Sequence, residues 1–318
     1  MTLNTIRQTG DPSNRVDIVF LGDGYTAGEL STTYRQHVNN LVDYVFTPNT
    51  LTDPFSRYQN FFNIHAIDVV SSESGADDPA SGVSVNTALN GSYRFDGVTD
   101  RLLSVDTTLG KNALTTALEG TGIDPELRLV TVNNTKYGGA GGYFATYAGG
   151  NSRALEVALH EIGHSFADLA DEYTYGGPVT YSGSEPSRAN ITTDASGSKW
   201  SHWLGYVDPN LGTVRAFEGA AYSEQGIYRP TDNSKMRNLD RAFDPIAKEQ
   251  FILQFYQYVD PLDSYTTENG SLTLSDPTSL TVTPIDTDVI DIAWTVNGAS
   301  VGGDQTSLDI GSLGLAIG

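Results

Sequence analysis

The chain has 318 residues, of which 38% are hydrophobic and 10% aromatic, enough for one large domain or for a large domain with a small appendage. Its 39 acidic residues outnumber 18 basic ones, and the net charge of −21 excludes nucleic acid and anionic membranes as expected partners. No run reaches the roughly 20 apolar residues of a membrane span, and the lack of cysteine excludes disulfides and thiolate metal ligands.

Apolar runs and helical periodicity indicate the secondary structure of the first half. Turn residues end the apolar runs, as Gly22-Asp23-Gly24 does after the first of them. We expect buried strands over residues 15–21, 60–70 and 128–133, and helices over residues 27–46 and 109–118.

Two other stretches carry turn and loop signals. Residues 71–97 are rich in Ser, Gly, Asp and Asn and predict a long irregular loop. Residues 138–147 hold four glycines and predict either an edge strand at the rim of an active site or a surface hairpin. No Gly-Lys-Ser/Thr follows, so this segment is not a phosphate-binding loop.

Residues 160–164, His-Glu-Ile-Gly-His, carry the strongest functional signal. They lie in a segment of helical periodicity that begins near residue 151 or 152. Its apolar stripe consists of Leu155, Leu159, Ile162, Phe166 and Leu169. Because residues i and i+4 share one face of a helix, His160 and His164 can bind a single Zn²⁺. Glu161 is rotated off that axis, where its carboxylate can accept a proton from a metal-bound water. Two ordinary helical histidines are the alternative, which the helix and the spacing disfavour.

A catalytic zinc usually has three protein ligands, and the third is not fixed by the residues alone. Asp168 is one turn beyond His164 on the same face. Asp171 and Glu172 can reach back only if the helix ends near Ala170 and the chain bends toward the metal. The extended metzincin motif would place its third ligand at Ala170, which cannot bind a metal.

Met236, the only methionine apart from Met1, lies in a turn-rich segment that precedes an expected helix over residues 245–259. Metzincins have a Met-turn beneath the zinc at a comparable place, whereas a lone methionine is more often core packing. In the same segment, Tyr228 is either an oxyanion stabiliser or a structural tyrosine.

The other histidines have weaker signals. We expect His37 on a helix surface and His65 in a strand. Trp200, His202 and Trp203 either flank a substrate cleft or form a local aromatic cluster.

The character of the sequence changes from about residue 271 to short β-type runs. These runs are residues 272–274, 280–282 and 290–296, and Asn297-Gly298 is a hairpin signal. We therefore expect a first domain over residues 1–265 and an all-β domain of the Ig-like sandwich type over residues 266–318. We expect the second domain to be incomplete, because the sequence stops at Gly318 within a set of strands and turns.

Several separated motifs, in the right order, resemble the clostridial-type IgA-specific metalloendopeptidases, a family of zinc peptidases. The resemblance spans roughly residues 12–262 and rests on residues 16–26, 72–75, 135–139, 160–173 and 228–237. It implies an α/β zincin (metzincin-like) catalytic domain with a mixed twisted sheet and an active-site helix, zinc endopeptidase activity and secretion.

The same resemblance implies roles for individual residues. It implies that His160 and His164 are zinc ligands and that Glu161 is the general base. It also implies that Met236 belongs to a Met-turn. It also implies an acidic ligand within residues 171–173, for which we choose Asp171, with Glu172 as the second choice. The IgA specificity in the family's name is not carried over, because nothing in this chain encodes it.

We therefore predict a secreted or cell-surface zinc endopeptidase, which acts as a monomer on protein or peptide substrates. Residues 1–10 contain no apolar core of a signal peptide. Asp77-Asp78 could hold a structural Ca²⁺, a second candidate cation, although a solvated acidic surface explains these residues more simply. Two other functions stay open: a zinc hydrolase that acts on a non-protein substrate, and a surface binding protein with an inactive site.

Overall fold

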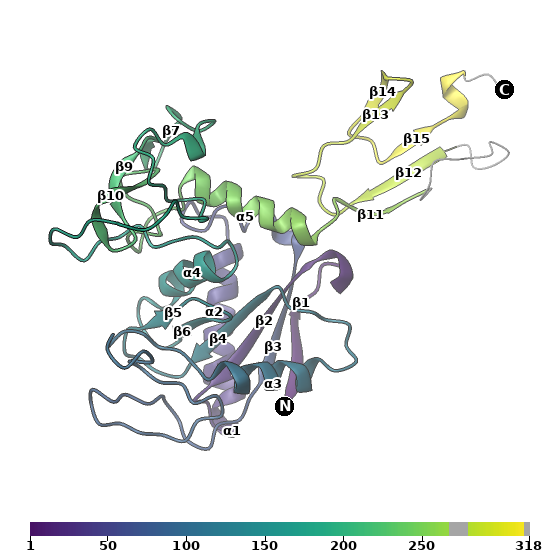
Figure 1. The fold of residues 1–318 in the computed structure, drawn as a ribbon. Coiled ribbons are helices and arrows are strands. Elements are labelled where there is room, and N and C mark those ends of the chain that lie inside the picture. The colour runs from purple at the N-terminus through teal and green to yellow at the C-terminus, as the bar shows by residue number, and fades with distance from the viewer. Residues whose placement is uncertain (267–278, 315–318) are drawn as a thin grey trace.

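The computed structural model describes residues 1–266 and 279–314 (Figure 1). Its largest sheet has six strands in the order β1-β3-β2-β4-β6-β5. The strands are β1 (Thr2–Arg7), β2 (Val16–Asp23), β3 (Phe62–Asp68), β4 (Leu127–Val132), β5 (Gly139–Ala140) and β6 (Ala145–Ala148). The four inner strands pair in parallel and the two edge strands, β1 and β5, are antiparallel, so the sheet is mixed.

Helices cover both faces of this sheet. They are α1 (Ala27–Glu29), α2 (Arg35–Phe46), α3 (Thr107–Leu118), α4 (Ala154–Ser165) and α5 (Pro245–Tyr258). Because side chains alternate along a strand, Phe20 of β2 packs with the cluster that includes α2 and α4, whereas Leu21 packs with the cluster that includes α3. Every residue of β2 is buried, as expected for a strand between two helical layers.

The predicted strands and helices of the first half are confirmed to within a few residues, with one difference. The helix expected over residues 27–46 is interrupted by a π-helical turn over Leu30–Tyr34. The short α1 before it begins with a capping box, in which the Glu29 carboxylate accepts the Thr26 backbone N–H at 2.8 Å. The predicted loop over residues 71–97 contains no helix or strand.

A loop-rich region that the sequence did not predict as strands follows α4. It contains β7 (Val207–Asp208), β8 (Gly212–Thr213) and an antiparallel hairpin of β9 (Phe217–Ala220) and β10 (Ser223–Arg229). Short 3-10 turns lie at Pro12–Asn14, Gln59–Phe61, Ser198–Trp200 and Gly311–Leu313.

The chain after α5 forms small antiparallel sheets, as expected for an all-β segment. One contains β11 (Leu262–Tyr265), β12 (Ser279–Pro284) and β15 (Ser307–Asp309), and the other pairs β13 (Ala293–Val296) with β14 (Ala299–Gly303). The predicted hairpin turn is confirmed, with Asn297 at φ 48° and Gly298 at φ 81°. The strand expected over 290–296 begins only at Ala293, and the one at 272–274 lies outside the described residues.

Specific contacts join these strands to the six-stranded sheet. The Arg15 guanidinium donates to both oxygens of Asp263, at 2.7 and 2.8 Å, and Asn60 donates to Asp286 at 2.9 Å. Ile285 belongs to the main core cluster. Within the described part of the chain, every helix lacks the length and apolar character needed to cross a bilayer.

Candidate metal centre

The helix α4 carries His160, Glu161 and His164 and ends at Ser165, four residues before the last residue of the apolar stripe, Leu169. Asp168 adopts a left-handed conformation with φ 50°, and the Leu169 N–H returns to the Gly163 carbonyl at 3.0 Å. This bond spans six residues, one more than the 6→1 bond of a Schellman motif, and it holds the chain reversal that follows the last turn of α4. The chain therefore turns back toward α4 directly after it.

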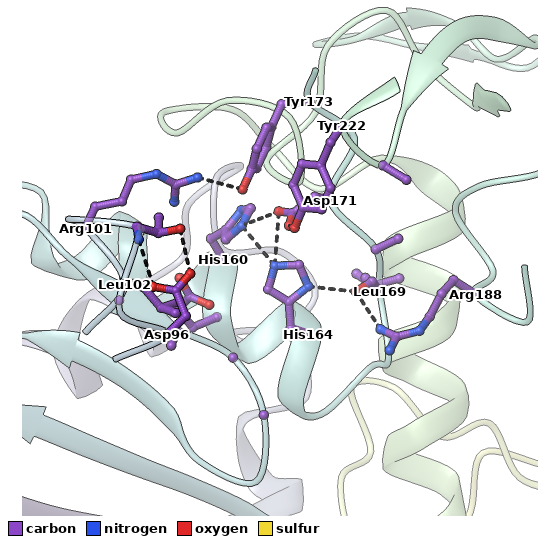
Figure 2. Close-up of a pocket in the computed structure, with 18 of the residues that line it drawn as sticks. Asp96, Arg101, Leu102, His160, His164, Leu169, Asp171, Tyr173, Arg188 and Tyr222 are labelled. Carbon is purple, nitrogen blue, oxygen red and sulfur yellow. Dashed lines mark hydrogen bonds and ion pairs between the residues drawn. The ribbon is translucent and has the colours of Figure 1, made fainter. Parts of the chain in front are cut away.

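Figure 2 shows the result of this turn: Asp171 faces the two imidazoles. The His160 Nε2 lies 3.1 Å from the His164 Nε2. The Asp171 Oδ1 lies 3.0 Å from the His160 Nε2 and 3.2 Å from the His164 Nε2. Three potential donor atoms thus form a nearly equilateral triangle.

Backbone carbonyls hold the other nitrogen of each ring. The His160 Nδ1 lies 3.1 Å from the Lys235 carbonyl oxygen, and the His164 Nδ1 lies 2.7 Å from the Leu169 carbonyl oxygen. Since a carbonyl only accepts, each Nδ1 carries a hydrogen, so a ring without a second proton presents a lone pair at Nε2. Two lone pairs and a carboxylate oxygen then face one another.

This donor set suits a cation. Three electron-rich atoms in contact repel one another unless a positive charge lies between them. Ligands about 2.0–2.1 Å from a tetrahedral zinc lie roughly 3.3 Å apart, close to the distances of this triangle. Two imidazoles and a carboxylate therefore fit a metal such as Zn²⁺.

The short distances between the three side chains shift the pKa values of Asp171 and His164. Burial opposes ionisation of Asp171, yet hydrogen bonds from His160 and His164 outweigh it and lower the pKa of Asp171 well below its usual value. Burial alone would lower the pKa of His164, but the hydrogen bond to Asp171 raises that pKa to about 9. Protons and a metal ion compete for these same nitrogens.

Glu161 lies beside the triangle and is not part of it. Its side chain is 8% exposed, and within the described residues its carboxylate makes no hydrogen bond. Burial raises the pKa of Glu161, and the charges of the two imidazoles only partly offset that effect. A carboxylate with a raised pKa and free oxygens is well suited to accept and return a proton.

The other two carboxylates considered from the sequence lie elsewhere. Asp168 is 64% exposed and pairs with Arg188 at 3.0 Å. Glu172 is fully buried and accepts hydrogen bonds from Asn190 at 2.9 Å and Ser234 at 2.6 Å. Neither joins the triangle of donor atoms.

Met236 packs against α4 at Gly163, the residue before His164. It is fully buried, and a Cβ added to Gly163 would meet its sulfur at 2.7 Å. Its backbone carbonyl accepts the Glu172 N–H at 2.9 Å. Met236 therefore packs in the core and also supports both the helix and the segment that carries Asp171.

A cavity of about 560 Å³ opens over the donor atoms. The glycine-rich segment after β4 lines one side of it, as the rim interpretation of residues 138–147 predicts. A Cβ on Gly141 would lie 2.5 Å from the Cβ of His164, so this segment touches the site directly. Arg101, Tyr173 and Tyr222 line the cavity too.

These last three residues have roles at the site that the sequence reasoning missed. The Tyr222 hydroxyl donates to the Asp171 Oδ2, and Arg101 donates to the Tyr173 hydroxyl at 2.9 Å (Figure 2). Tyr173 lay in a motif that supported the resemblance, but Tyr222 is 51 residues from Asp171 and no pattern linked the two.

Several residues weighed from the sequence are structural. Tyr228 lies in β10 and pairs with Glu218, away from the cavity. His65 is buried in β3 as predicted, while His37 is half-buried rather than on the surface and contacts the Tyr25 hydroxyl at 2.7 Å.

The aromatic patch and the acidic loop likewise make local contacts. His202 and Trp203 bind Glu249 of α5 and do not line the cavity. Asp78 pairs with Lys136 at 2.9 Å. Across residues 1–266 and 279–314, no other group of three His, Asp or Glu side chains lies close enough together to bind one ion. The candidate Ca²⁺ near Asp77-Asp78 therefore has no such group of ligands among the described residues.

The chain was compared with known protein families and with curated proteins. No curated protein matches the chain. The family described as IgA Peptidase M64 matches residues 5–213, a range that holds the six-stranded sheet except the first residues of β1, together with α4 and all three donor residues. Because the match covers more than half of the chain, the protein belongs to the IgA Peptidase M64 family, a family of metallopeptidases.

Proposed function

We propose that this metallopeptidase is a secreted, zinc-dependent endopeptidase in which His160, His164 and Asp171 bind the zinc. The observation that carries the proposal is the convergence of two imidazole lone pairs and a carboxylate oxygen within 3.2 Å of one another. When bound, a zinc ion would acidify water and polarise the peptide carbonyl as a Lewis acid.

The residues of this chain then perform the proton transfers. Glu161 accepts the proton of the attacking water and returns it to the leaving amine, a role favoured by its raised pKa. The carbonyls of Lys235 and Leu169 fix the two rings, and the Tyr222 hydroxyl fixes Asp171. Such outer contacts hold metal ligands in position before the metal binds.

A metzincin-like zincin fold is part of the proposal. The metzincin motif has a glycine turn three residues after the second histidine and a ligand three residues later. Here the left-handed turn is Asp168 and the ligand is Asp171, so both are displaced by one residue and their spacing is kept. Met236 beneath Gly163 supports the Met-turn interpretation.

We also propose the division into a catalytic domain, residues 1–265, and an Ig-like β-sandwich domain, residues 266–318. The antiparallel sheets after α5 support it, with β11 at the boundary and paired to β12 beyond it. Secretion is supported by the acidic, cysteine-free composition together with the family membership.

The test combines metal analysis with a protease assay. We expect about one zinc per chain by elemental analysis, and hydrolysis of fluorescent casein that stops with 1,10-phenanthroline and returns with added zinc. Glu161→Gln should keep its zinc and its melting temperature but lose activity by about 10²–10⁴-fold.

Other outcomes would contradict specific parts of the proposal. Zinc without casein hydrolysis would favour a hydrolase of non-protein substrates, and a protein that binds no zinc would favour an inactive binding protein. Full activity in Glu161→Gln would exclude Glu161 as the general base.

A further inference from the structure

A second cavity, of about 310 Å³, adjoins the larger cavity over the donor atoms, and the two share a wall. Arg101, Tyr173, Tyr175, His160 and Glu161 line both. Figure 2 shows Arg101 reaching toward Tyr173, next to His160. A side chain of a substrate held at Glu161 therefore lies within reach of the second cavity.

The lining of the second cavity is cationic, although the chain as a whole carries a charge of −21. Arg101 and Arg237 both line it, and we call it the arginine cavity. Lys235 also lines the cavity, but its buried ammonium is paired with the Glu156 carboxylate at 2.7 Å. Apart from Glu161, none of the lining residues is acidic.

The two guanidinium groups are available to an anion. Neither lies within 4.0 Å of a carboxylate in the described part of the chain, in contrast to Arg15, which is paired with Asp263. The Arg237 Nη1 is buried and has no hydrogen-bond acceptor among the described residues. Because the Arg237 guanidinium has no carboxylate partner within residues 1–266 and 279–314, an anion that entered the cavity would gain a charge-assisted hydrogen bond.

Arg101 is held in place for this role. Its Nη2 donates to the Tyr173 hydroxyl at 2.9 Å and to the Tyr175 hydroxyl at 3.3 Å. Its guanidinium carbon lies 5.6 Å from the centre of the Tyr173 ring. Neutral partners fix the side chain without cancelling its charge, which is the arrangement expected of a binding arginine.

We propose that the arginine cavity is a specificity subsite that binds a carboxylate of the substrate next to the bond that is cut. The source is an Asp or Glu side chain, or the free C-terminal carboxylate of a peptide, because both present the same planar group to a guanidinium fork. This inference rests on the proposed peptidase function and adds a substrate preference to it.

The experiment measures a ratio of rates. A bond that the enzyme cuts in casein, located by mass spectrometry, gives the parent sequence of an internally quenched peptide. Pairs of peptides carry Glu or its neutral isostere Gln on either side of that bond, each with a free or an amidated C-terminus. We expect kcat/KM to favour a carboxylate by about tenfold or more, as for a hydrogen bond to a charged group.

Variants of Arg237 assign that preference to the cavity. Arg237→Gln should bring the ratio of kcat/KM for the Glu and Gln peptides close to one, and Arg237→Glu should make a Lys peptide the better substrate. Arg237→Lys keeps the charge and should retain part of the preference. Arg241→Gln is the matched control, since Arg241 is exposed in the same segment and lies outside the cavity.

The results separate this inference from the function on which it rests. A wild-type enzyme that cuts casein but treats Glu, Gln, free and amidated peptides alike would overturn the subsite and leave the peptidase intact. So would a preference that survives in a folded Arg237→Gln protein. Failure to cut any protein would remove the proposed function and the subsite together. If the preference disappeared when the C-terminus was amidated but not when Glu was replaced by Gln, the terminal carboxylate would be the group that the cavity binds.

Discussion

At the scale of single residues, the candidate site is a set of lone pairs that are fixed before any cation arrives. Two backbone carbonyls set the tautomers of His160 and His164, and the Tyr222 hydroxyl donates a hydrogen bond to the second carboxylate oxygen of Asp171. Preorganisation of this kind lowers the entropy lost when a metal binds.

The choice of third ligand is tested by a pair of variants. Asp171→Asn removes the anionic donor and should lower zinc affinity by more than the 10–100-fold typical of losing an outer partner. Glu172→Gln should retain zinc, because Glu172 is hydrogen-bonded to Asn190 and Ser234 and burial raises its pKa toward the neutral form that Gln resembles. Competition with a fluorescent chelator measures the zinc affinity of both variants. If only Glu172→Gln lost zinc, Glu172 and not Asp171 would be the third ligand.

Tyr222 gives a second prediction at this scale. Tyr222→Phe removes only the hydroxyl that donates to Asp171 and keeps the ring that stacks on Tyr175 at 5.0 Å. We expect zinc affinity to fall by about 10–100-fold while the melting temperature of the zinc-free protein is unchanged. Isothermal titration with zinc measures the first quantity, and an unchanged affinity would show that Asp171 needs no support from Tyr222.

At the scale of elements, the site depends on how α4 ends and on what packs against it. The sequence predicted the beginning of the motif well, because the spacing of His160 and His164 and the apolar stripe agree. It missed the end of the helix, since Leu169 continues the apolar period although the left-handed Asp168 has already turned the chain. A non-glycine residue at such a turn gives little warning.

The choice of Asp171 needed the family resemblance, because residue types alone left three carboxylates open. The β9–β10 hairpin was missed for a different reason: its residues include Glu218, Gly219 and Gly226, which are poor strand formers. Arg101 and Tyr222 reach the site only through tertiary folding, so no local pattern could place them there. The six-stranded sheet and its helices, in contrast, follow from strong apolar periodicity.

The glycine segment beside α4 gives a prediction for an element. Gly141→Ala places a methyl group 2.5 Å from the His164 Cβ, so that either the segment or the histidine must move. We expect activity to fall at least tenfold, or stability to fall by about 1–3 kcal/mol, as for an overpacked site. Gly142→Ala is the control, because its Cβ would meet nothing within 4 Å. Urea unfolding and the casein assay separate the two effects.

At the scale of the whole molecule, the strands after α5 are joined to the main sheet by a largely buried ion pair. The Arg15 side chain is 1% exposed and its partner Asp263 is 34% exposed. Hydrogen bonds from Arg15 hold the pKa of Asp263 below its usual value. A carboxyl group whose pKa is lowered by folding stabilises the protein above its unfolded pKa, near 4, and this stabilisation is lost as the pH falls through the folded value.

This pair therefore predicts a pH-dependent difference between two proteins. Asp263→Asn should destabilise the fold at pH 7 by about 1–3 kcal/mol, less than for a fully buried pair because Asp263 is partly exposed. The difference from wild type should shrink as the pH falls from about 5 to 2. Urea titrations across that range measure it, with the exposed Asp291→Asn as a control for charge alone. A difference that is constant with pH would argue against the ion pair.

The contact between Arg15 and Asp263 has a topological consequence as well. It brings positions 248 residues apart in the chain to 2.7 Å, and nearby the Asn14 side-chain oxygen accepts a hydrogen bond from the Asp260 N–H. The stretch between them is almost a closed ring. A protein cut once at an exposed loop such as residues 176–180 should therefore stay together as two associated pieces, with an intact histidine–aspartate triangle.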